Sequence, residues 1–463
     1  MNVYKKCSDL VLVETIPSED PPNIYLESYS HPLIVEMASF SLSSIKNLPL
    51  LNPLLKTSPH QQILCVLLGL ATYLALVSSL RFRRRQTLHK EYNYYGTRQS
   101  MRSMSDQDAW AIQKTIMQTE FPFIVLKSLQ FALFRTYGIP TISTLLLKTS
   151  QLSDSTTSFK RYADTGTLIG EFMAFDPRSE RAQTAIARTK FLHKGYRASG
   201  KILEGDMLYT LSLFALEPIR FVKVFEWREM TEMERCAIGT YWKSLGDALG
   251  ISYDTLPSGK TGFQDGIHWL EEIGVWSEQY EVQHMKPHPR NKEIAEKTID
   301  VLLYNVPNFL KPLGGYFVSY LMGDRLRTAM MMEEPPAVFS GILASTFKLR
   351  QLYLRYLSLP RPNFMRLDVF TEKPNEHGRN WVLIYEGAPF YVQPTIWNRW
   401  GPMAWFKWAL GQPLPGDDGD KYYPQGYRTH ELGPKYFEGK GYKELEDFKE
   451  TLRHQRMGQC PFP

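Results

Sequence analysis

The residues whose spacing is best suited to chemistry lie in segment 178–199, which carries one histidine among small and apolar side chains. Ala185, Thr189, His193 and Tyr196 recur at steps of four, four and three residues, so they share one face of a predicted helix. The small side chains before the histidine leave room for a flat group. This arrangement suits a haem whose iron is bound by the imidazole of His193. The alternative is a histidine satisfied by a hydrogen bond to a neighbour.

A second polar cluster lies upstream, in the sequence RYADTGTLIGE over residues 161–171. Asp164 and Thr165 follow Arg161 by three and four residues, so a helix here presents all three side chains on one face. A fixed guanidinium in a dry pocket stabilises developing negative charge without reorganisation. The same residues also fit an ordinary salt-bridge or capping cluster. Downstream, the apolar segment 205–221 is suited to form a pocket wall for a lipophilic substrate.

Several other chemistries find no support in the sequence. There is no glycine-rich nucleotide loop, no HExxH zinc motif and no recognisable nucleophile elbow. The four cysteines form no CxxC pair, so neither a disulfide framework nor a zinc site is predicted. CxxCH is also absent, so any haem is expected to be held non-covalently. The formal charge of +6, from 54 basic and 48 acidic residues, is modest and spread out, which argues against a nucleic-acid partner.

The elements that must position these residues are mainly helical. Thr231 and Glu234 predict a capping box at the start of one helix, and Gly250 marks its end. Two short runs around 386–389 predict a hairpin over Trp381–Val392. Because strands and helices do not alternate, the predicted fold class is all-α with a minor β hairpin. Predicted helices cover 105–120, 123–134, 178–199, 205–221, 230–250, 291–304, 313–332 and 337–357.

An uncharged apolar segment, Ile63–Leu80, is long enough to cross a bilayer. Six Lys or Arg residues follow within twenty residues, against two in the twenty residues before it. The positive-inside rule therefore predicts residues 81–463 in the cytosol and residues 1–60 as a lumenal tail. A buried core helix is the alternative. A cleaved signal peptide fits less well, because the basic cluster lies on the wrong side.

The C-terminal part has a different composition. Four tryptophans lie beside Arg399 and Lys407 within 394–427. Such an element fits the membrane interface, and capping of the core fits equally well. The basic helix 347–357 offers a similar choice, with a solvated face favoured. The predicted organisation is a tail over 1–60, a membrane span over 63–80, a catalytic domain over 105–445 and a C-terminal tail over 446–463.

The order of Arg161, Thr165 and a later helix bearing His193 resembles the latex-clearing proteins, or rubber oxygenases. These bacterial haem enzymes cleave double bonds in polyisoprene with dioxygen, on a globin-like helical core. The resemblance implies that His193 is the proximal iron ligand and that Arg161 and Thr165 line the distal side. The chain departs from the family at two points. The family's distal lysine corresponds to Asp164, and no glutamate stands near Leu145, where the rubber enzymes carry a catalytic carboxylate.

Longer blocks between about residues 105 and 445 are similar to the MpaB-type oxygenases of fungal mycophenolic acid biosynthesis. This resemblance implies an enzyme bound to the endoplasmic reticulum, with its catalytic domain in the cytosol. It also implies oxidative cleavage of a double bond in the farnesyl chain of a prenylated phthalide, which leaves a shortened carboxylic acid. The blocks are FALFRTYGIPTIS (131–143), ARTKFLHKGYRASGKIL (187–203), AIGTYWKSLGDALGIS (237–252), LPSGKTGFQDGIHWLEE (256–272), YLSLPRP (356–362) and GPKYFEGKGYKEL (433–445).

Residues and resemblance together predict a membrane-bound oxygenase with non-covalent haem b ligated by His193. Arg161 is expected to stabilise negative charge on bound oxygen, and Thr165 to donate a hydrogen bond to it. Asp164 is expected to orient Arg161 rather than to move a proton. The expected partners are a lipophilic prenylated aromatic substrate, dioxygen and the endoplasmic-reticulum membrane. The competing hypotheses are a non-haem tailoring enzyme and a membrane-tethered binding or scaffold protein.

Overall fold

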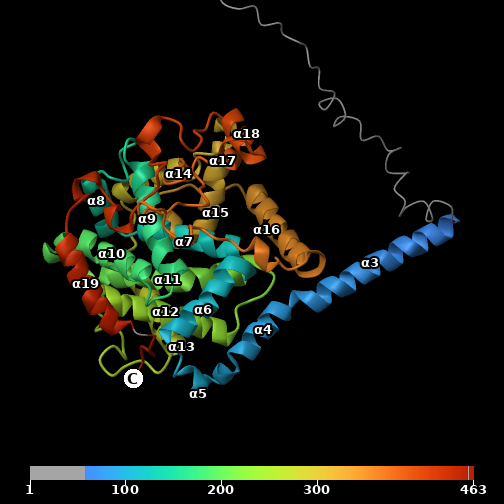
Figure 1. Ribbon diagram of the computed structural model, residues 1–463, viewed down its shortest axis with the longest axis horizontal. Coiled ribbons are helices and arrows are strands. Elements are labelled where there is room, and N and C mark those ends of the chain that lie inside the picture. The colour runs from blue at the N-terminus through green and yellow to red at the C-terminus, as the bar shows by residue number, and fades with distance from the viewer. Residues whose placement is uncertain (1–57, 457, 463) are drawn as a thin grey trace, which may run out of the picture. The chain divides into compact units, whose positions relative to one another are not determined.

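The structure is a computed structural model that describes residues 58–456 and 458–462. These residues form helices and no sheet, which confirms the predicted all-α class (Figure 1). The chain divides into two compact units, 1–72 and 73–463. Residues 1–57 lie outside the described residues, so the lumenal tail stays a prediction. The longer helices are α3 (Pro59–Arg81), α4 (Arg83–Glu91), α6 (Asp106–Thr115), α7 (Pro122–Thr136), α8 (Pro140–Thr149), α9 (Ser158–Ala174), α10 (Glu180–Ala198), α11 (Glu204–Phe225), α12 (Glu232–Leu249), α13 (Gly266–His284), α14 (Pro289–Leu302), α15 (Lys311–Ala329), α16 (Ala337–Leu352), α18 (Pro402–Ala409) and α19 (Tyr442–Gln455).

The predicted membrane span lies inside α3. Among the described residues, one helix is long and apolar enough to cross a membrane, and it begins at Pro59. Its apolar side chains are largely exposed, with Val77 as the buried exception among them. A core helix of a soluble protein would bury such side chains, so this finding counts against the core-helix alternative.

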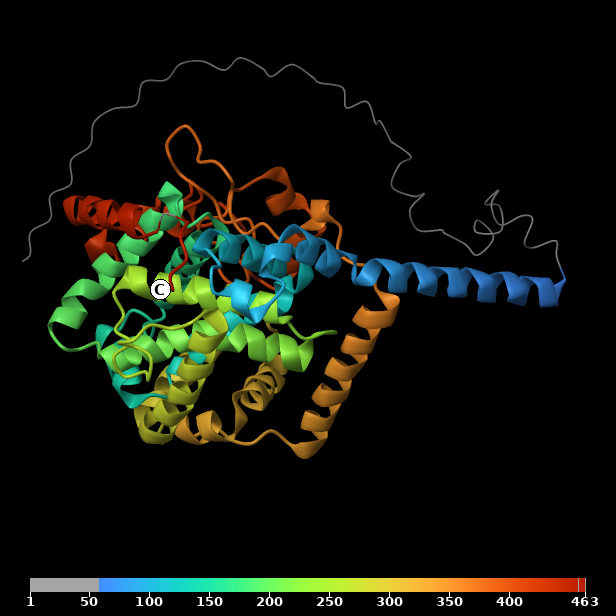
Figure 2. The ribbon, with the colours of Figure 1, turned by 90° about the horizontal axis from the view of Figure 1, so that it is seen from below.

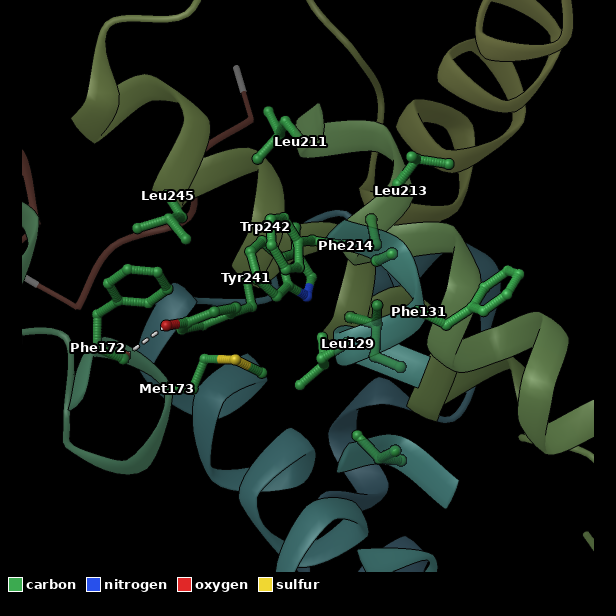
Figure 3. Packing of buried hydrophobic residues seen from close by; sticks show 14 of the residues in the cluster. Leu129, Phe131, Phe172, Met173, Leu211, Leu213, Phe214, Tyr241, Trp242 and Leu245 are labelled. Carbon is green, nitrogen blue, oxygen red and sulfur yellow. Dashed lines mark hydrogen bonds between the residues drawn. The ribbon is translucent and has the colours of Figure 1, made fainter. Parts of the chain in front are cut away.

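The hydrophobic core of the larger unit lies where α11 and α12 pack against α6, α7 and α13. Trp242 of α12 stacks on Phe214 of α11, with ring centroids 5.2 Å apart (Figure 3). The hydroxyl of Tyr241 donates to the carbonyl of Phe172 at 2.5 Å, so this buried polar atom is satisfied. These aromatic side chains fix α12 between the helices on either side of it.

Helix α12 also shows how local signals set the ends of an element. Thr231 and Glu234 form the predicted capping box, and Gly250 ends the helix at φ +67°. Within the helix, a Cβ at Gly239 would lie 2.1 Å from the carbonyl oxygen of Gly266. The backbones of α12 and α13 therefore touch at a point where only glycine fits.

The predicted hairpin over 381–392 is not formed as two paired strands. The two runs share one backbone hydrogen bond, from Val382 N–H to the Tyr391 carbonyl at 2.9 Å. Val382 instead forms an isolated bridge with Phe370. Tyr391 adopts φ +65°, and its N–H donates to Tyr422 rather than back across the turn. The segment is therefore held by distant parts of the chain.

The segment 446–463, expected to be a tail, packs against the domain in its described part. Helix α19 begins just before this segment, its Leu452 is buried, and it lies against α10. Beyond the helix, Arg456 is 1% exposed and donates to the carboxylate of Asp106 at 3.3 Å. Apolar residues at 445, 448 and 452 have the helical spacing that indicates such packing.

Candidate functional site

Helix α10 carries the candidate iron ligand and confirms the helix predicted over 178–199. It begins after Ser179, whose hydroxyl accepts a hydrogen bond from the Ala182 N–H at 3.2 Å. Its buried face includes Ala185 and Ala187, which let α9 and α19 pack closely against it. The last turns, which hold His193, are half-buried or exposed. The imidazole therefore lies where α10 leaves the core.

One nitrogen of His193 is held and the other is free. Nδ1 lies 2.7 Å from the carbonyl oxygen of Thr189. A carbonyl only accepts, so Nδ1 carries the proton and the lone pair lies on Nε2. Within the described part of the chain, Nε2 has no hydrogen-bond partner. Loss of solvent lowers the pKa of His193, and the charge of Arg161 lowers it further. Both effects favour the neutral, metal-binding form.

The guanidinium of Arg161 is held by its own helix. Its Nη1 donates to the hydroxyl oxygen of Thr165, and that hydroxyl donates its single proton to the Arg161 carbonyl at 2.7 Å. Because the hydroxyl has one proton, it has none left for another acceptor in this arrangement. In the structure Thr165 therefore holds the guanidinium of Arg161, and its predicted hydrogen bond to bound oxygen stays a prediction.

The positive charge of Arg161 acts on the pKa of ionisable groups from three other elements. Burial raises the pKa of Tyr137, after α7, to about 12, against the opposing effect of Arg161. Loss of solvent and a hydrogen bond with Tyr196 raise the pKa of Tyr436 to about 12, again opposed by Arg161. His193 on α10 is the third such group. The common site predicted for Arg161 and His193 stays a prediction.

Asp164 is bound by groups other than Arg161. Lys160 Nζ lies 2.9 Å from Oδ2 of the carboxylate, and the hydroxyl of Tyr391 donates to Oδ1 at 2.5 Å. The carboxylate is almost fully buried, and this burial raises its pKa. No hydrogen bond joins Asp164 to Arg161 among the described residues. The positive charge of Arg161 nevertheless lowers the pKa of this carboxyl, against the larger effect of burial, so the expected orienting role of Asp164 stays a prediction.

A loop formed by residues 432–440 is held against α9 and α10 by hydrogen bonds to its carbonyl groups. Arg188 is fully buried and donates to the carbonyls of Leu432, Phe437 and Lys440, at 2.8, 3.1 and 3.3 Å. From α9, Lys160 donates to the Gly433 carbonyl at 2.9 Å. We name this segment, residues 432–440, the cover loop; it carries Tyr436 to the region of Arg161. Residue spacing in the sequence did not identify Lys160, Arg188 or Tyr436 as residues that form this region. Arg188 and Tyr436 do lie within the segments 187–203 and 433–445 that carry the family resemblance.

The Trp-rich segment does not cap the core. All four tryptophans of α17 (Ile396–Trp400) and α18 are more than half exposed. The structure therefore contradicts the core-capping alternative. Exposed indole rings are typical of protein or lipid interfaces.

The residues present fit a haem better than a bare metal ion. In the described residues, no group of three or more His, Cys, Asp or Glu side chains could hold a metal ion. A haem needs one imidazole from the protein, and Nε2 of His193 is available.

Comparisons with known proteins place the chain in a family. No family model matches the sequence. The chain is 53% identical to "ER-bound oxygenase mpaB'" of Penicillium brevicompactum, over 89% of its own length and 98% of that protein. It is 48% identical to "ER-bound oxygenase mpaB" of the same species, over 84% and 93% of the two chains. The chain belongs to the ER-bound oxygenase mpaB family.

A further relative, "ER-bound oxygenase mpaB" of Penicillium roqueforti, is 58% identical over 57% of this chain and 89% of its own. The chain is thus an oxygenase. Among solved structures, latex clearing protein in its closed state matches with a TM-score of 0.44 and 17% identity, over 57% of this chain and 73% of that one.

Proposed function

We propose that this oxygenase is anchored in the endoplasmic-reticulum membrane by α3 and cleaves a double bond in the farnesyl chain of a prenylated phthalide. The products are two carbonyl compounds, one on each former alkene carbon, which together take up the two atoms of dioxygen. Conversion of the aldehyde to the shortened acid of mycophenolic acid biosynthesis is a separate step, by this enzyme or another, that uses water and a two-electron acceptor. The relatives' names support the membrane and the reaction class. The observation that carries the proposal is the Nε2 of His193, left without a partner among the described residues while Nδ1 is held by the Thr189 carbonyl.

Non-covalent haem b, when bound, supplies iron that activates dioxygen for reaction with the alkene. His193 holds the iron through Nε2, and the Thr189 carbonyl fixes the tautomer and the ring orientation. Arg161 supplies a positive charge near developing negative charge on oxygen, and Thr165 keeps that guanidinium in place. Asp164 retains the ammonium of Lys160 and thereby anchors the cover loop.

The anchor suits such a substrate. A farnesyl chain is apolar and partitions into lipid, so an enzyme tethered to the bilayer meets it where it accumulates. In the proposed orientation the N-terminus is lumenal and unit 73–463 is cytosolic, because arginines follow the span directly.

The test begins with the purified full-length protein and does not depend on turnover. We expect a Soret band and a pyridine haemochrome, both lost in His193→Ala while the far-ultraviolet circular dichroism is unchanged. His193→Ala that retains the full haem content would place the ligand elsewhere. Thr189→Val is the matched control, because its backbone carbonyl remains and haem binding is expected to persist.

Turnover is then assayed with a farnesylated phthalide under isotopically labelled dioxygen. Label in the cleaved carbonyl or acid product is the expected result. A haem-free preparation that cleaves the chain would indicate a non-haem tailoring enzyme. Binding of the substrate without turnover by haem-loaded protein would indicate a binding or scaffold protein.

A further inference from the structure

Helix α16 packs on the protein through Phe347, whose ring centroid lies 4.6 Å from that of Phe225, and through polar side chains near its C-terminal end, while several of its apolar residues are exposed. Its polar residues Arg350 and Gln351 face the protein: Arg350 donates to the Phe225 carbonyl and to Glu226, both at 2.8 Å, and Gln351 donates to Val224. None of its side chains is fully buried. Leu349 is 66% exposed, although α16 is firmly fixed to the end of α11. Figure 2 shows α16 in orange at the margin of the unit.

The exposed apolar surface continues beyond α16. Past the π turn Tyr353–Leu357, Phe364 is 87% exposed in the short helix Asn363–Met365. We name residues 337–365 the α16 surface. A contiguous apolar patch on a soluble protein marks an interaction site rather than ordinary surface. Its exposed large apolar side chains are Val338, Ile342, Leu349, Leu352, Tyr353, Tyr356, Leu357, Leu359, Phe364 and Met365.

The charge of this surface is one-sided. Residues 337–365 contain no acidic residue and four basic ones, Lys348, Arg350, Arg355 and Arg361. Three of the four are exposed, and Arg350 is the one that pairs with Glu226. Apolar side chains with exposed cations among them are the composition that binds an anionic lipid leaflet.

The α16 surface is joined to the membrane helix. Tyr73, in the C-terminal half of α3, donates its hydroxyl to the Leu357 carbonyl at 2.7 Å. Arg84 donates to the Arg361 carbonyl just after that helix ends. Tyr73 precedes Arg81, the last residue of α3, by eight residues, or about 12 Å along the axis. If the basic end of α3 marks the headgroup level, Leu357 lies below it, among the acyl chains.

We infer that the α16 surface inserts into the cytosolic leaflet beside α3, so that the enzyme is bound to lipid by a second, monotopic contact. The inference rests on the proposed membrane anchoring and adds to it an occupant for this surface, the lipid bilayer. The contact fixes the orientation of the catalytic unit on the membrane, which a single spanning helix leaves free to rotate.

The experiment uses full-length protein in vesicles of phosphatidylcholine with a minority of phosphatidylserine. A fluorescent NBD label is attached at one cysteine at a time, in a chain lacking Cys7 and Cys460; Cys236 is buried and unreactive. The label is placed on native Cys65 within the span, or, in Cys65→Ala, on Leu349→Cys, Phe364→Cys or Val275→Cys. Val275 on α13 is the matched control, an apolar residue 60% exposed outside the α16 surface.

We expect lipids with nitroxide-labelled acyl chains to quench the labels at 65, 349 and 364 and to leave the label at 275 bright. Quenching at 65 with bright labels at 349 and 364 would overturn the inference and leave the anchor intact. A bright label at 65 would instead overturn the anchoring proposal. The labels at 349 and 364 could also become buried without being quenched by lipid, to an extent that depends on the protein-to-lipid ratio. That result would indicate contact with a second copy of the chain and would also overturn the inference.

Discussion

Replacing Lys160 with methionine removes the one cation bonded to the buried carboxylate of Asp164 in the described structure. The two charged groups lie 2.9 Å apart, and their side chains are 11% and 2% exposed. At an effective dielectric constant of about 20 they attract by about 6 kcal/mol. Breaking such a pair from one side costs about 3–5 kcal/mol, because it leaves an uncompensated charge. We therefore expect Lys160→Met to lower the free energy of unfolding by about 3–5 kcal/mol.

The pH dependence of the free energy of unfolding provides a second, independent test of Lys160→Met. Burial already raises the pKa of Asp164, and loss of the ammonium raises it further. The folded variant then keeps a proton that the unfolded chain releases above about pH 4. Its stability therefore falls as the pH rises, by about 1.4 kcal/mol per pH unit up to the folded pKa. Guanidinium unfolding of the full-length protein in detergent, at about pH 5 and about pH 7.5, measures both effects.

A surface pair of the same length is the control. Lys194 and Glu444 are also 2.9 Å apart, but their side chains are 58% and 44% exposed. Lys194→Met is expected to cost about 0–1 kcal/mol at either pH. The reasoning is refuted if both variants lower the free energy of unfolding by the same small amount and Lys160→Met is equally stable at both pH values. That result would mean that Lys160 does not stabilise the charge of Asp164.

Three further predictions concern the cover loop, Gly441 directly after it, and Arg161. We expect Gly441→Ala to lower the free energy of unfolding by about 2–4 kcal/mol, because φ is +82° and the Cβ would lie 2.2 Å from Phe191. Gly439→Ala is the control: φ is +70° but no neighbour lies within 4 Å, so we expect a loss of about 1–2 kcal/mol. Thermal unfolding measures both variants. Thr165→Val should lower kcat about 10–100-fold with haem content unchanged, since a hydrogen bond to a charged group is lost; equal kcat would contradict it. Arg188→Met should expose residues 432–440 to limited proteolysis, and unchanged cleavage would contradict this expectation.

Most helices could be predicted because their signals are local. Thr231, Glu234 and Gly250 set the ends of α12 through contacts within a few residues of each other. The pair formed by Lys160 and Asp164 is also local, at a spacing of four residues. From the sequence we nevertheless expected Asp164 to pair with Arg161. Lys160 precedes Asp164 by four residues and Arg161 precedes it by three, and either spacing places the two side chains on one helix face. The second partner of the carboxylate, Tyr391, is distant in sequence and could not be found from local spacing.

Features that depend on tertiary contacts could not be predicted from local sequence patterns. The Trp-rich segment has the same composition whether its rings are buried or exposed, and only the packed structure shows Trp397 and its neighbours exposed. The hairpin was predicted from local alternation, but the positive φ of Tyr391 and the bond to Tyr422 decide the backbone there. The globin-like arrangement of the core stays a prediction.

The fastening of the cover loop by Arg188 has a consequence for synthesis of the chain. Helices α9 and α10 are translated well before the carbonyls that Arg188 binds, which lie near the C-terminus. While the ribosome is still extending the chain, the guanidinium of Arg188 has none of these three carbonyl partners. Docking of residues 432–440 is therefore a late step of folding, and until it occurs α10 carries an unsatisfied charge at a position that is dry in the folded protein.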